Sequence, residues 1–279
     1  MSEKNSVLLN RFFSRHTFRE ILEEGISSTY AAVVRKYLAN TDEMTNAACI
    51  SEIYEYMEKY YRNEYFYKNT LLNKLLLGVH SLNTTSALTE VPVGKSKADF
   101  ILINGCATVY EIKTELDNFD RLMGQLEDYY KAFSRVIVVT SESNYSLLQK
   151  RLEGLPTGIC VLTHRGHLSH RKQPEEFCGD LSSDIMFKIL RKSEYEEILL
   201  REYSYLPSVS QFSYYRACKS MFGALTTDQQ QQNLVKALKK RIQIEVESFK
   251  KIPYELKFLV YFSNLREVDY TKLENFLRS

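Results

Sequence analysis

Two acidic residues and a lysine near the middle of the chain have the types and spacing that hydrolytic chemistry requires. Glu111 and Lys113 flank Ile112 in a run that predicts a β-strand, so the carboxylate and the ammonium point to one face and Ile112 points to the other. Asp99 lies on the strand predicted before it. Two carboxylates at the ends of adjacent strands supply hard oxygen ligands for Mg²⁺ or Mn²⁺, and a neighbouring lysine stabilises charge on a phosphate. Together, Asp99, Glu111 and Lys113 predict phosphodiester hydrolysis. The alternative is that Asp99 only ends a turn and that Glu111 and Lys113 form an ordinary exposed ion pair.

Whether Asp99 shares a face with Glu111 depends on the hairpin loop between their strands. The turn residues are Asn104 and Gly105, and a loop of only these two would place Asp99 on the opposite face from Glu111. A three-residue loop with Gly105 in the left-handed conformation would pair Asp99 with Val109 and bring all the reactive residues to one face. An active site here therefore requires an odd loop or a bulge.

Hydrophobic periodicity predicts the elements that must hold these residues. Three short runs rich in β-branched and aliphatic residues predict a meander, and a later continuous apolar run is typical of a buried parallel strand. Helices separate the later strands, so we expect an α/β protein with a mixed central sheet. The expected elements are strands at 88–93, 98–103 and 107–114, a helix at 118–133, a strand at 135–140, a helix at 145–152, and a strand at 158–163 with a return strand from 168.

The stretch Lys97-Ala-Asp-Phe-Ile-Leu-Ile-Asn-Gly-Cys-Ala-Thr-Val-Tyr-Glu-Ile-Lys113 resembles the D-then-ExK signature of the PD-(D/E)XK nuclease superfamily, which has the restriction-endonuclease-like fold. The αβββαβ order of predicted elements is that of this superfamily, and the resemblance covers residues 60 to 172. Ala98 stands where proline is common. The resemblance implies a Mg²⁺-dependent nuclease, with DNA as the expected substrate and Lys113 as the water-positioning base or electrostatic stabiliser.

Two residues of the following helix carry a second resemblance. Gln125 and Tyr129 are similar to the QxxxY motif of RecB-type exonuclease branches, and their spacing places them on one face of the helix. The resemblance implies a catalytic role for Gln125 and substrate contact for Tyr129, with Lys97 also at the substrate. The alternative is that Tyr129 belongs to the core stripe of the helix and Gln125 to its polar edge.

The resemblance also implies a set of metal ligands. Asp99 and Glu111 are the expected carboxylate ligands, and Ile112 is assigned to the metal site between Glu111 and Lys113. The superfamily often adds a glutamate from the first core helix. Glu64 and Glu90 are both candidates for that role.

Both ends of the chain are predicted to be helical. We expect an N-terminal helical region at 1–60, the nuclease-like core at 61–172 and a C-terminal helical region at 173–279. A break at Gly25 between two helices has the outline of a helix-turn-helix DNA reader, but that outline is common and a plain packing role is the favoured interpretation. A tyrosine-rich stretch at 50–78 favours core packing over base stacking.

The C-terminal region contains a short basic patch. Helices are predicted at 183–202, 211–222, 228–249, 253–264 and 270–277. The long helix at 228–249 has one apolar face, and its basic residues form either a solvated face or a phosphate-contacting surface. Those residues are Lys236, Lys239, Lys240 and Arg241.

Five cysteines without a CxxC pair are typical of reduced intracellular thiols. Some lie near three histidines, so a zinc site is one hypothesis for this stretch, although the spacing matches no common zinc module. The alternative is a β-hairpin turning at Arg165-Gly166, with the histidines at its exposed rim. The residues concerned are Cys160, His164, His167, His170 and Cys178.

Composition and charge bear on the location and partners of the protein more than on its activity. The net charge of +2 does not by itself indicate nucleic-acid binding. No apolar run approaches the roughly 20 residues that span a bilayer, and the sequence starts without a signal-peptide core, so we expect a cytoplasmic protein without membrane contact. The helical ends would grip nucleic acid or bind a second copy or another protein. Two other functions stay open: a catalytically silent module that binds nucleic acid or protein on a nuclease fold, and an RNA-cleaving toxin.

Overall fold

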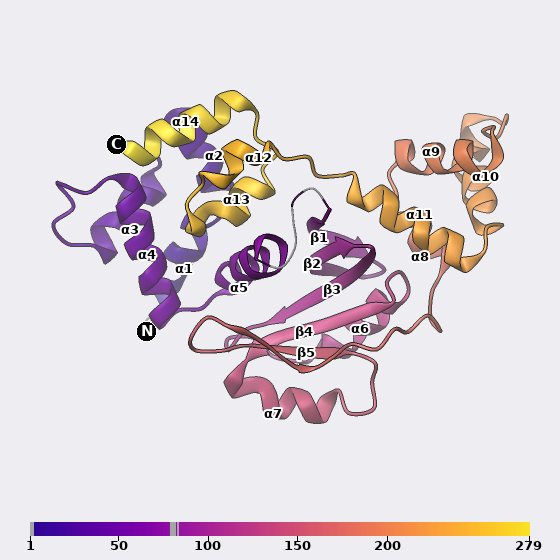
Figure 1. The fold of residues 1–279 in the computed structure, drawn as a ribbon, viewed down its shortest axis with the longest axis horizontal. Coiled ribbons are helices and arrows are strands. Elements are labelled where there is room, and N and C mark those ends of the chain that lie inside the picture. The colour runs from indigo at the N-terminus through magenta and orange to yellow at the C-terminus, as the bar shows by residue number, and fades with distance from the viewer. Residues whose placement is uncertain (1–2, 79–81, 83) are drawn as a thin grey trace. The chain divides into compact units, whose positions relative to one another are not determined.

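A computed structural model describes residues 3–78, 82 and 84–279 of the chain, which form two compact units (Figure 1). The helical unit comprises Met1–Leu82, Thr114–Leu116 and Gln243–Ser279, and the sheet unit comprises Asn83–Lys113 and Asp117–Ile242. These limits differ from the boundaries expected at 60 and 172. The last helices pack with the N-terminal ones, so the C-terminal region is shared between both units.

Short capped helices build the helical unit. Ser14, Ser27 and Thr45 each accept a backbone N–H in the first turn of the helix that follows, which satisfies donors without a partner inside the helix. Gly25 ends a helix with φ 70°, which confirms the predicted break. The elements are α1 Glu3–Phe12, α2 Arg15–Glu24, α3 Ser28–Tyr37, α4 Asn46–Tyr60, α5 Glu64–Leu71, the π-helix η1 Leu72–Leu77, α12 Val246–Lys250, the 3₁₀-helix η2 Tyr254–Leu256, α13 Lys257–Tyr261 and α14 Glu267–Arg278.

Several tyrosines of the 50–78 stretch pack in the core of this unit. Tyr54 and Tyr65 are buried, and the Tyr65 hydroxyl donates to the Glu255 carbonyl at 2.5 Å. Asn69 donates to the Tyr54 hydroxyl and to the Tyr254 carbonyl, both at 3.0 Å. These bonds join α5 to the chain near η2. The expectation of core packing is confirmed for these residues.

Among the described residues, the sheet unit contains one six-stranded sheet in the order β1-β2-β3-β4-β5-β6. Strands β1 to β5 are labelled in Figure 1. The first three strands are antiparallel, β3, β4 and β5 are parallel, and β6 returns antiparallel to β5. The parallel pairs follow from the crossover helices that connect them. The elements are β1 Ser86–Val93, β2 Ser96–Asn104, β3 Cys106–Lys113, α6 Leu122–Tyr130, β4 Arg135–Ser141, α7 Glu142–Arg151, β5 Gly158–Leu162 and β6 Leu168–Lys172.

Four further helices complete the sheet unit: α8 Ser183–Ile189, α9 Lys192–Tyr203, α10 Gln211–Gly223 and α11 Thr227–Lys239. The single helix expected at 183–202 is divided, because Leu190 is extended and the Arg191 N–H donates to the Glu194 carboxylate to start α9. The prediction of one long helix at 228–249 is also wrong. Helix α11 ends at Lys239, and Glu245 caps a separate helix, α12, by accepting the N–H groups of residues 247 and 248.

One face of the sheet carries the core that positions the candidate site. Ile101, Val109 and Val138 on this face pack in one cluster with residues of α6. The predicted stripe of α6 is buried there, although the helix begins at Leu122 rather than at residue 118. The members of the stripe are Leu122, Leu126, Tyr129 and Phe133. Within the described part of the chain, every helix is too short or too polar to cross a lipid bilayer.

Candidate active site

The register of β2 against β3 decides which residues meet. Asn104 pairs with Cys106 around Gly105, whose φ is 74°, and the same register continues to the pair Phe100 and Tyr110. The next step in this register places Asp99 opposite Glu111. The loop therefore has an odd number of residues, which is the condition for Asp99 and Glu111 to share a face. The expected pairing of Asp99 with Val109 is wrong by two residues, because Val109 pairs with Ile101.

Glu111 lies at the centre of the cluster and is 1% exposed. Its Oε1 atom accepts hydrogen bonds from Lys113 Nζ at 2.9 Å and from Gln125 Nε2 at 2.6 Å. Its Oε2 atom accepts from the Tyr129 hydroxyl at 2.6 Å. Because a buried carboxylate is stable only when it is paired and hydrogen-bonded, these three donors account for its presence in the core.

Lys113 extends from the same face of β3 and is 9% exposed. Besides Glu111, its ammonium donates to Gln125 Oε1 at 2.9 Å. The Lys113 carbonyl accepts from the Thr140 hydroxyl at 2.8 Å, which joins the end of β3 to β4. Gln125 thus contacts both charged groups through its two amide atoms, which fixes their separation.

Asp99 lies where β2 separates from β3, and it is partly exposed. Its Oδ2 atom accepts the Ile112 N–H at 2.9 Å, and its carbonyl accepts from the Thr89 hydroxyl at 2.7 Å. Ile112 itself has only a backbone carbonyl to offer a metal ion, since its side chain is apolar and buried on the other face. Asp99 is therefore oriented by the backbone of the strand that carries Glu111.

Glu90 lies on β1 in the left-handed backbone region, with φ 57°. Only a few per cent of residues other than glycine adopt this conformation, and such strain is concentrated at functional positions. A carboxylate oxygen of Glu90 lies within 4.8 Å of one of Asp99, and the Glu90 carboxylate pairs with Lys97 Nζ at 3.2 Å. The side chain of Lys97 is 59% exposed, so it is accessible as the substrate prediction requires.

Glu64, the other glutamate expected at the metal site, begins α5 in the helical unit. Its carboxylate pairs with Lys68 Nζ at 2.5 Å. Its assignment to the metal site stays a prediction, whereas Glu90 and Asp99 belong to one unit.

Tyr129 is fully buried, which argues against the expected direct contact with substrate. Its hydroxyl lies 2.6 Å from Glu111 Oε2 and 2.9 Å from the Lys97 carbonyl, and a single proton can be donated to only one of them at a time. Burial raises the pKa of Tyr129 far above its ordinary value, and the charge of Glu111 raises it further. Tyr129 therefore stays protonated and positions Glu111, combining the core and site roles that the sequence offered as alternatives.

Asp128, next to Tyr129, was not identified from the sequence as part of this region. Its carboxylate accepts the Lys95 N–H at 2.9 Å, the Ser96 hydroxyl at 2.8 Å and the Lys131 ammonium at 2.9 Å, so it anchors the β1–β2 turn to α6. Gly94 in this turn has φ 61°, and a Cβ there would lie 2.5 Å from Asp128 Oδ1. Burial alone would raise the pKa of Asp128, but the hydrogen bonds from Lys131 and Ser96 and from the Lys95 N–H hold it below its ordinary value.

The cysteine and histidine stretch forms the expected hairpin of β5 and β6. Cys160 is buried in β5, and burial raises the pKa of its thiol to about 12. His164, His167 and His170 are exposed near the turn. Within the described residues these side chains do not gather into a possible metal site. The zinc reading is therefore not supported.

The oxygen donors of the sheet unit fit a hard divalent cation better than a soft one. Asp99 and Glu90 bring carboxylate oxygens within 4.8 Å of one another, and both side chains are at least partly exposed. Carboxylates and carbonyls are the ligands that Mg²⁺ and Mn²⁺ prefer. Glu111 is different, because its oxygens already accept hydrogen bonds from three side chains.

The fold and the site together define a mixed α/β protein with a buried carboxylate–lysine pair beside a half-exposed pair of carboxylates. Residues 57–257 match the family described as Bacteriophage P4 protein cII. Because this match spans well over half of the 279 residues, the chain belongs to that family.

Comparison with individual proteins is less extensive. Protein cII of Enterobacteria phage P4 is 26% identical over 122 residues, which are 42% of this chain and 46% of that protein. The matched region therefore spans about half the length of this curated relative. Among solved structures, the SPO1766 protein of unknown function from Silicibacter pomeroyi is similar to 46% of this chain and 87% of its own, with 11% identity. Its TM-score of 0.29 is too low to indicate a shared fold.

Proposed function

We propose that this protein is a metal-dependent nuclease with a restriction-endonuclease-like core. The observation that supports the proposal is the register of β2 and β3, which brings Asp99, Glu111 and Lys113 to one face of the sheet. The element order from β1 to β5, three antiparallel strands, a crossover helix, a parallel strand and a helix leading to another parallel strand, agrees with the core expected from the sequence.

Within this proposal, each residue of the candidate site has a distinct role. Asp99 and Glu111 would hold Mg²⁺ or Mn²⁺, together with Glu90 and the Ile112 carbonyl. When bound, the ion would neutralise a phosphate and lower the pKa of a water. Lys113 would stabilise charge on the phosphate oxygens, because its ammonium is held at the same face as both carboxylates.

Gln125 and Tyr129 would act as positioning residues. Gln125 contacts Glu111 and Lys113 at once, and the Tyr129 hydroxyl contacts Glu111 and the Lys97 carbonyl. The exposed side chain of Lys97 would contact a backbone phosphate of the substrate. DNA remains the expected substrate, with RNA as the alternative that the same chemistry permits.

The proposal is tested by incubating the purified protein with linear, circular and single-stranded DNA and with RNA, in Mg²⁺, Mn²⁺ or a chelator. We expect cleavage of nucleic acid in the samples with metal and none with the chelator. Calorimetry with Mn²⁺ alone should also show binding, which Asp99→Ala should weaken. Absence of both metal binding and cleavage would contradict the proposal.

A second candidate function is a non-catalytic module that retains this arrangement for stability. The observation that favours it is the almost complete burial of Glu111, whose oxygens are already satisfied by Lys113, Gln125 and Tyr129. If metal does not bind and stability alone responds to substitutions in the cluster, this reading replaces the first. The protein would then bind nucleic acid or another protein without cleaving it.

A further inference from the structure

We propose that the exposed face of α10 binds single-stranded nucleic acid by stacking bases on Phe212 and Tyr215. Phe212 is fully exposed and Tyr215 is 47% exposed. They are three residues apart, so they lie on neighbouring positions of one helix face. We call the set of Phe212, Tyr215, Arg216 and Lys219 the α10 face.

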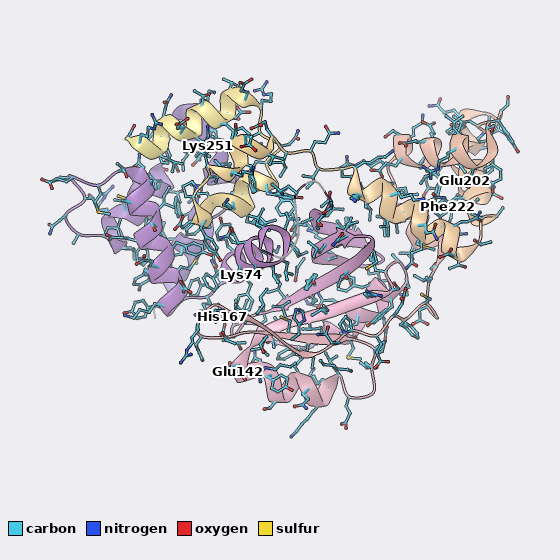
Figure 2. The ribbon with its side chains drawn as sticks, viewed as in Figure 1. Lys74, Glu142, His167, Glu202, Phe222 and Lys251 are labelled. Atoms are coloured by element: carbon cyan, nitrogen blue, oxygen red, sulfur yellow. The ribbon has the colours of Figure 1, made fainter. Side chains whose placement is uncertain are left out.

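The side of α10 next to Tyr215 is fixed in the core of the sheet unit. Cys218 and Phe222 are fully buried, and Figure 2 labels Phe222. The Phe222 ring packs on Phe187 of α8 with centroids 5.5 Å apart. Tyr215 also contacts Phe187, with centroids 5.3 Å apart and an angle of 61° between the rings. Tyr215 is therefore held upright by the core while part of its ring stays open to solvent. The helix backbone that carries the α10 face is therefore anchored in the core, and Tyr215 is held from one side by Phe187.

The charge around this face complements a polyanion. Residues 203–227 contain two basic residues, Arg216 and Lys219, and no aspartate or glutamate. Lys219 and Lys188 both pair with Asp184, and Arg216, one turn before Lys219 on α10, is exposed. On α9, Glu196 accepts from the Tyr214 hydroxyl and pairs with Lys192. The four cations Lys188, Lys192, Arg216 and Lys219 therefore stand against the two carboxylates Asp184 and Glu196, a local positive excess that would attract phosphates.

Aromatic rings beside basic groups are the arrangement that binds single strands without sequence preference. Every base has a flat π-face that stacks on an exposed ring, whereas the bases of a duplex are already stacked on each other. A partner of aliphatic protein surface would gain from Phe212 but would not explain the surrounding cations. The observations therefore favour a single-stranded polyanion with aromatic bases over a protein partner.

This inference rests on the proposed function for its substrate class, because a nuclease needs a surface that holds the strand it cuts. The binding itself does not depend on the residues at Asp99 and Glu111. Binding and cleavage can therefore be measured separately, and the failure of one does not imply the failure of the other.

The test uses the whole 279-residue chain and a fluorescent oligothymidylate of about 15 nucleotides, which covers the usual range of single-strand site sizes. Anisotropy is measured in a chelator, so that no cleavage occurs. We expect Phe212→Ala to weaken binding roughly 5- to 100-fold, the range that the loss of one stacked base produces. Arg216→Ala should weaken binding and make it less dependent on salt.

Two variants and one competitor sharpen the result. Phe212→Leu keeps an apolar side chain but cannot stack, so it should behave like Phe212→Ala. Tyr60→Ala removes another exposed tyrosine, on α4 of the helical unit, and should leave binding unchanged. A duplex of the same length should bind more weakly than the single strand.

Unchanged affinity in Phe212→Ala, or full affinity in Phe212→Leu, would overturn the inference. So would a change from dimer to monomer in Phe212→Ala without loss of oligonucleotide binding, because the face would then be a contact between copies of the chain. If oligothymidylate binding depends on Phe212 but the wild type cleaves nothing, the inference stands and the proposed nuclease activity fails. Because Phe212 is fully exposed, its substitution should leave the thermal unfolding temperature unchanged, and this check excludes misfolding.

Discussion

At the scale of single residues, the candidate site depends on how one buried carboxylate is satisfied. Glu111 is almost inaccessible, yet it has a cation, an amide and a phenol within hydrogen-bond distance. Removing one donor from a buried charged acceptor costs more than removing both partners together. Substitutions of the donors are therefore more informative than substitutions of Glu111 itself.

Tyr129→Phe is expected to destabilise the protein by about 1 to 3 kcal/mol, because Glu111 Oε2 loses its donor in the core. The matched control is Tyr130→Phe. The neighbouring Tyr130 hydroxyl is also buried but shares a hydrogen bond with the neutral Thr157 hydroxyl at 3.0 Å, so its loss should cost less, about 1 kcal/mol. Urea unfolding measures both. Equal losses in the two variants would show that the Tyr129–Glu111 contact is not the stronger one.

At the scale of elements, the strands were predictable from the sequence but their register was not. The β-branched runs of β1, β2 and β3 gave the correct meander, since local composition favours extended backbone. The pairing of Asp99 with Glu111 depends on the conformation of Gly105, which suits either an even or an odd loop. One glycine therefore separates an assembled site from one divided across the sheet.

The remaining errors come from tertiary contacts that no local pattern reveals. The apolar periodicity at 228–249 continues past the end of α11, but the chain is held there by Arg241, which donates twice to the Glu194 carboxylate at 2.7 Å and once to the Ile189 carbonyl. Lys240 pairs with Glu197, so the expected basic patch is partly neutralised. The role of Asp128 is likewise invisible in the sequence, because Lys95 and Ser96, the partners that it anchors in the β1–β2 turn, lie more than 30 residues away.

The β1–β2 turn gives a prediction for an element. Gly94→Ala should destabilise the protein by more than about 1 kcal/mol, because the turn requires a positive φ and the new Cβ would collide with Asp128. The control is Gly124→Ala, which lies within α6 with no neighbouring atom within 4 Å of the added Cβ. It should stabilise the protein by up to about 1 kcal/mol. Thermal and urea unfolding of both variants measure the difference, and a neutral Gly94→Ala would contradict the close approach of turn and helix.

Asp128 gives a pH-dependent prediction for the same contact. Its pKa is lower in the folded protein than in the unfolded chain, so its charge stabilises the fold above the unfolded value of about 4 and this contribution is lost as the pH falls further. Asp128→Asn should therefore be less stable than the wild type at pH 7. The difference in the free energy of unfolding between the two proteins, the stability gap, should shrink below about pH 4. Urea unfolding at several pH values measures the gap. A constant gap would mean that the shape of the side chain matters and its charge does not.

At the scale of the whole molecule, the chain begins and ends in the same unit. Helices α12 to α14 follow the sheet unit in sequence but belong to the helical unit, where the Asn46 amide donates to the Phe276 carbonyl at 2.8 Å and Phe258 N donates to Asn69 Oδ1 at 3.0 Å. This division could not be read from the sequence, because helical periodicity gives no information about the partner that covers each apolar face. The helical unit is therefore discontinuous, and each part needs the other.

A chain shortened to end at Ile242 should retain the sheet unit and lose the structure of the helical unit. The truncation removes buried side chains such as Phe249, Leu259 and Leu273, so the remaining N-terminal helices would expose their apolar faces. We expect a loss of helical circular dichroism greater than the removed segment accounts for, and increased binding of a hydrophobic dye. Circular dichroism that falls only in proportion to the removed helices would contradict this description of the unit.

The central claim is that Asp99, Glu111 and Lys113 form one catalytic site, and metal-dependent cleavage by matched variants tests it most directly. The rate of DNA or RNA cleavage in Mn²⁺ is compared among the wild type, Asp99→Asn, Lys113→Met and Asp120→Asn, the last being an exposed aspartate of the same unit. The account predicts that Asp99→Asn and Lys113→Met lose at least about 100-fold in rate while Asp120→Asn keeps the wild-type rate. Equal cleavage by all four proteins, or cleavage by none on any substrate, would contradict it.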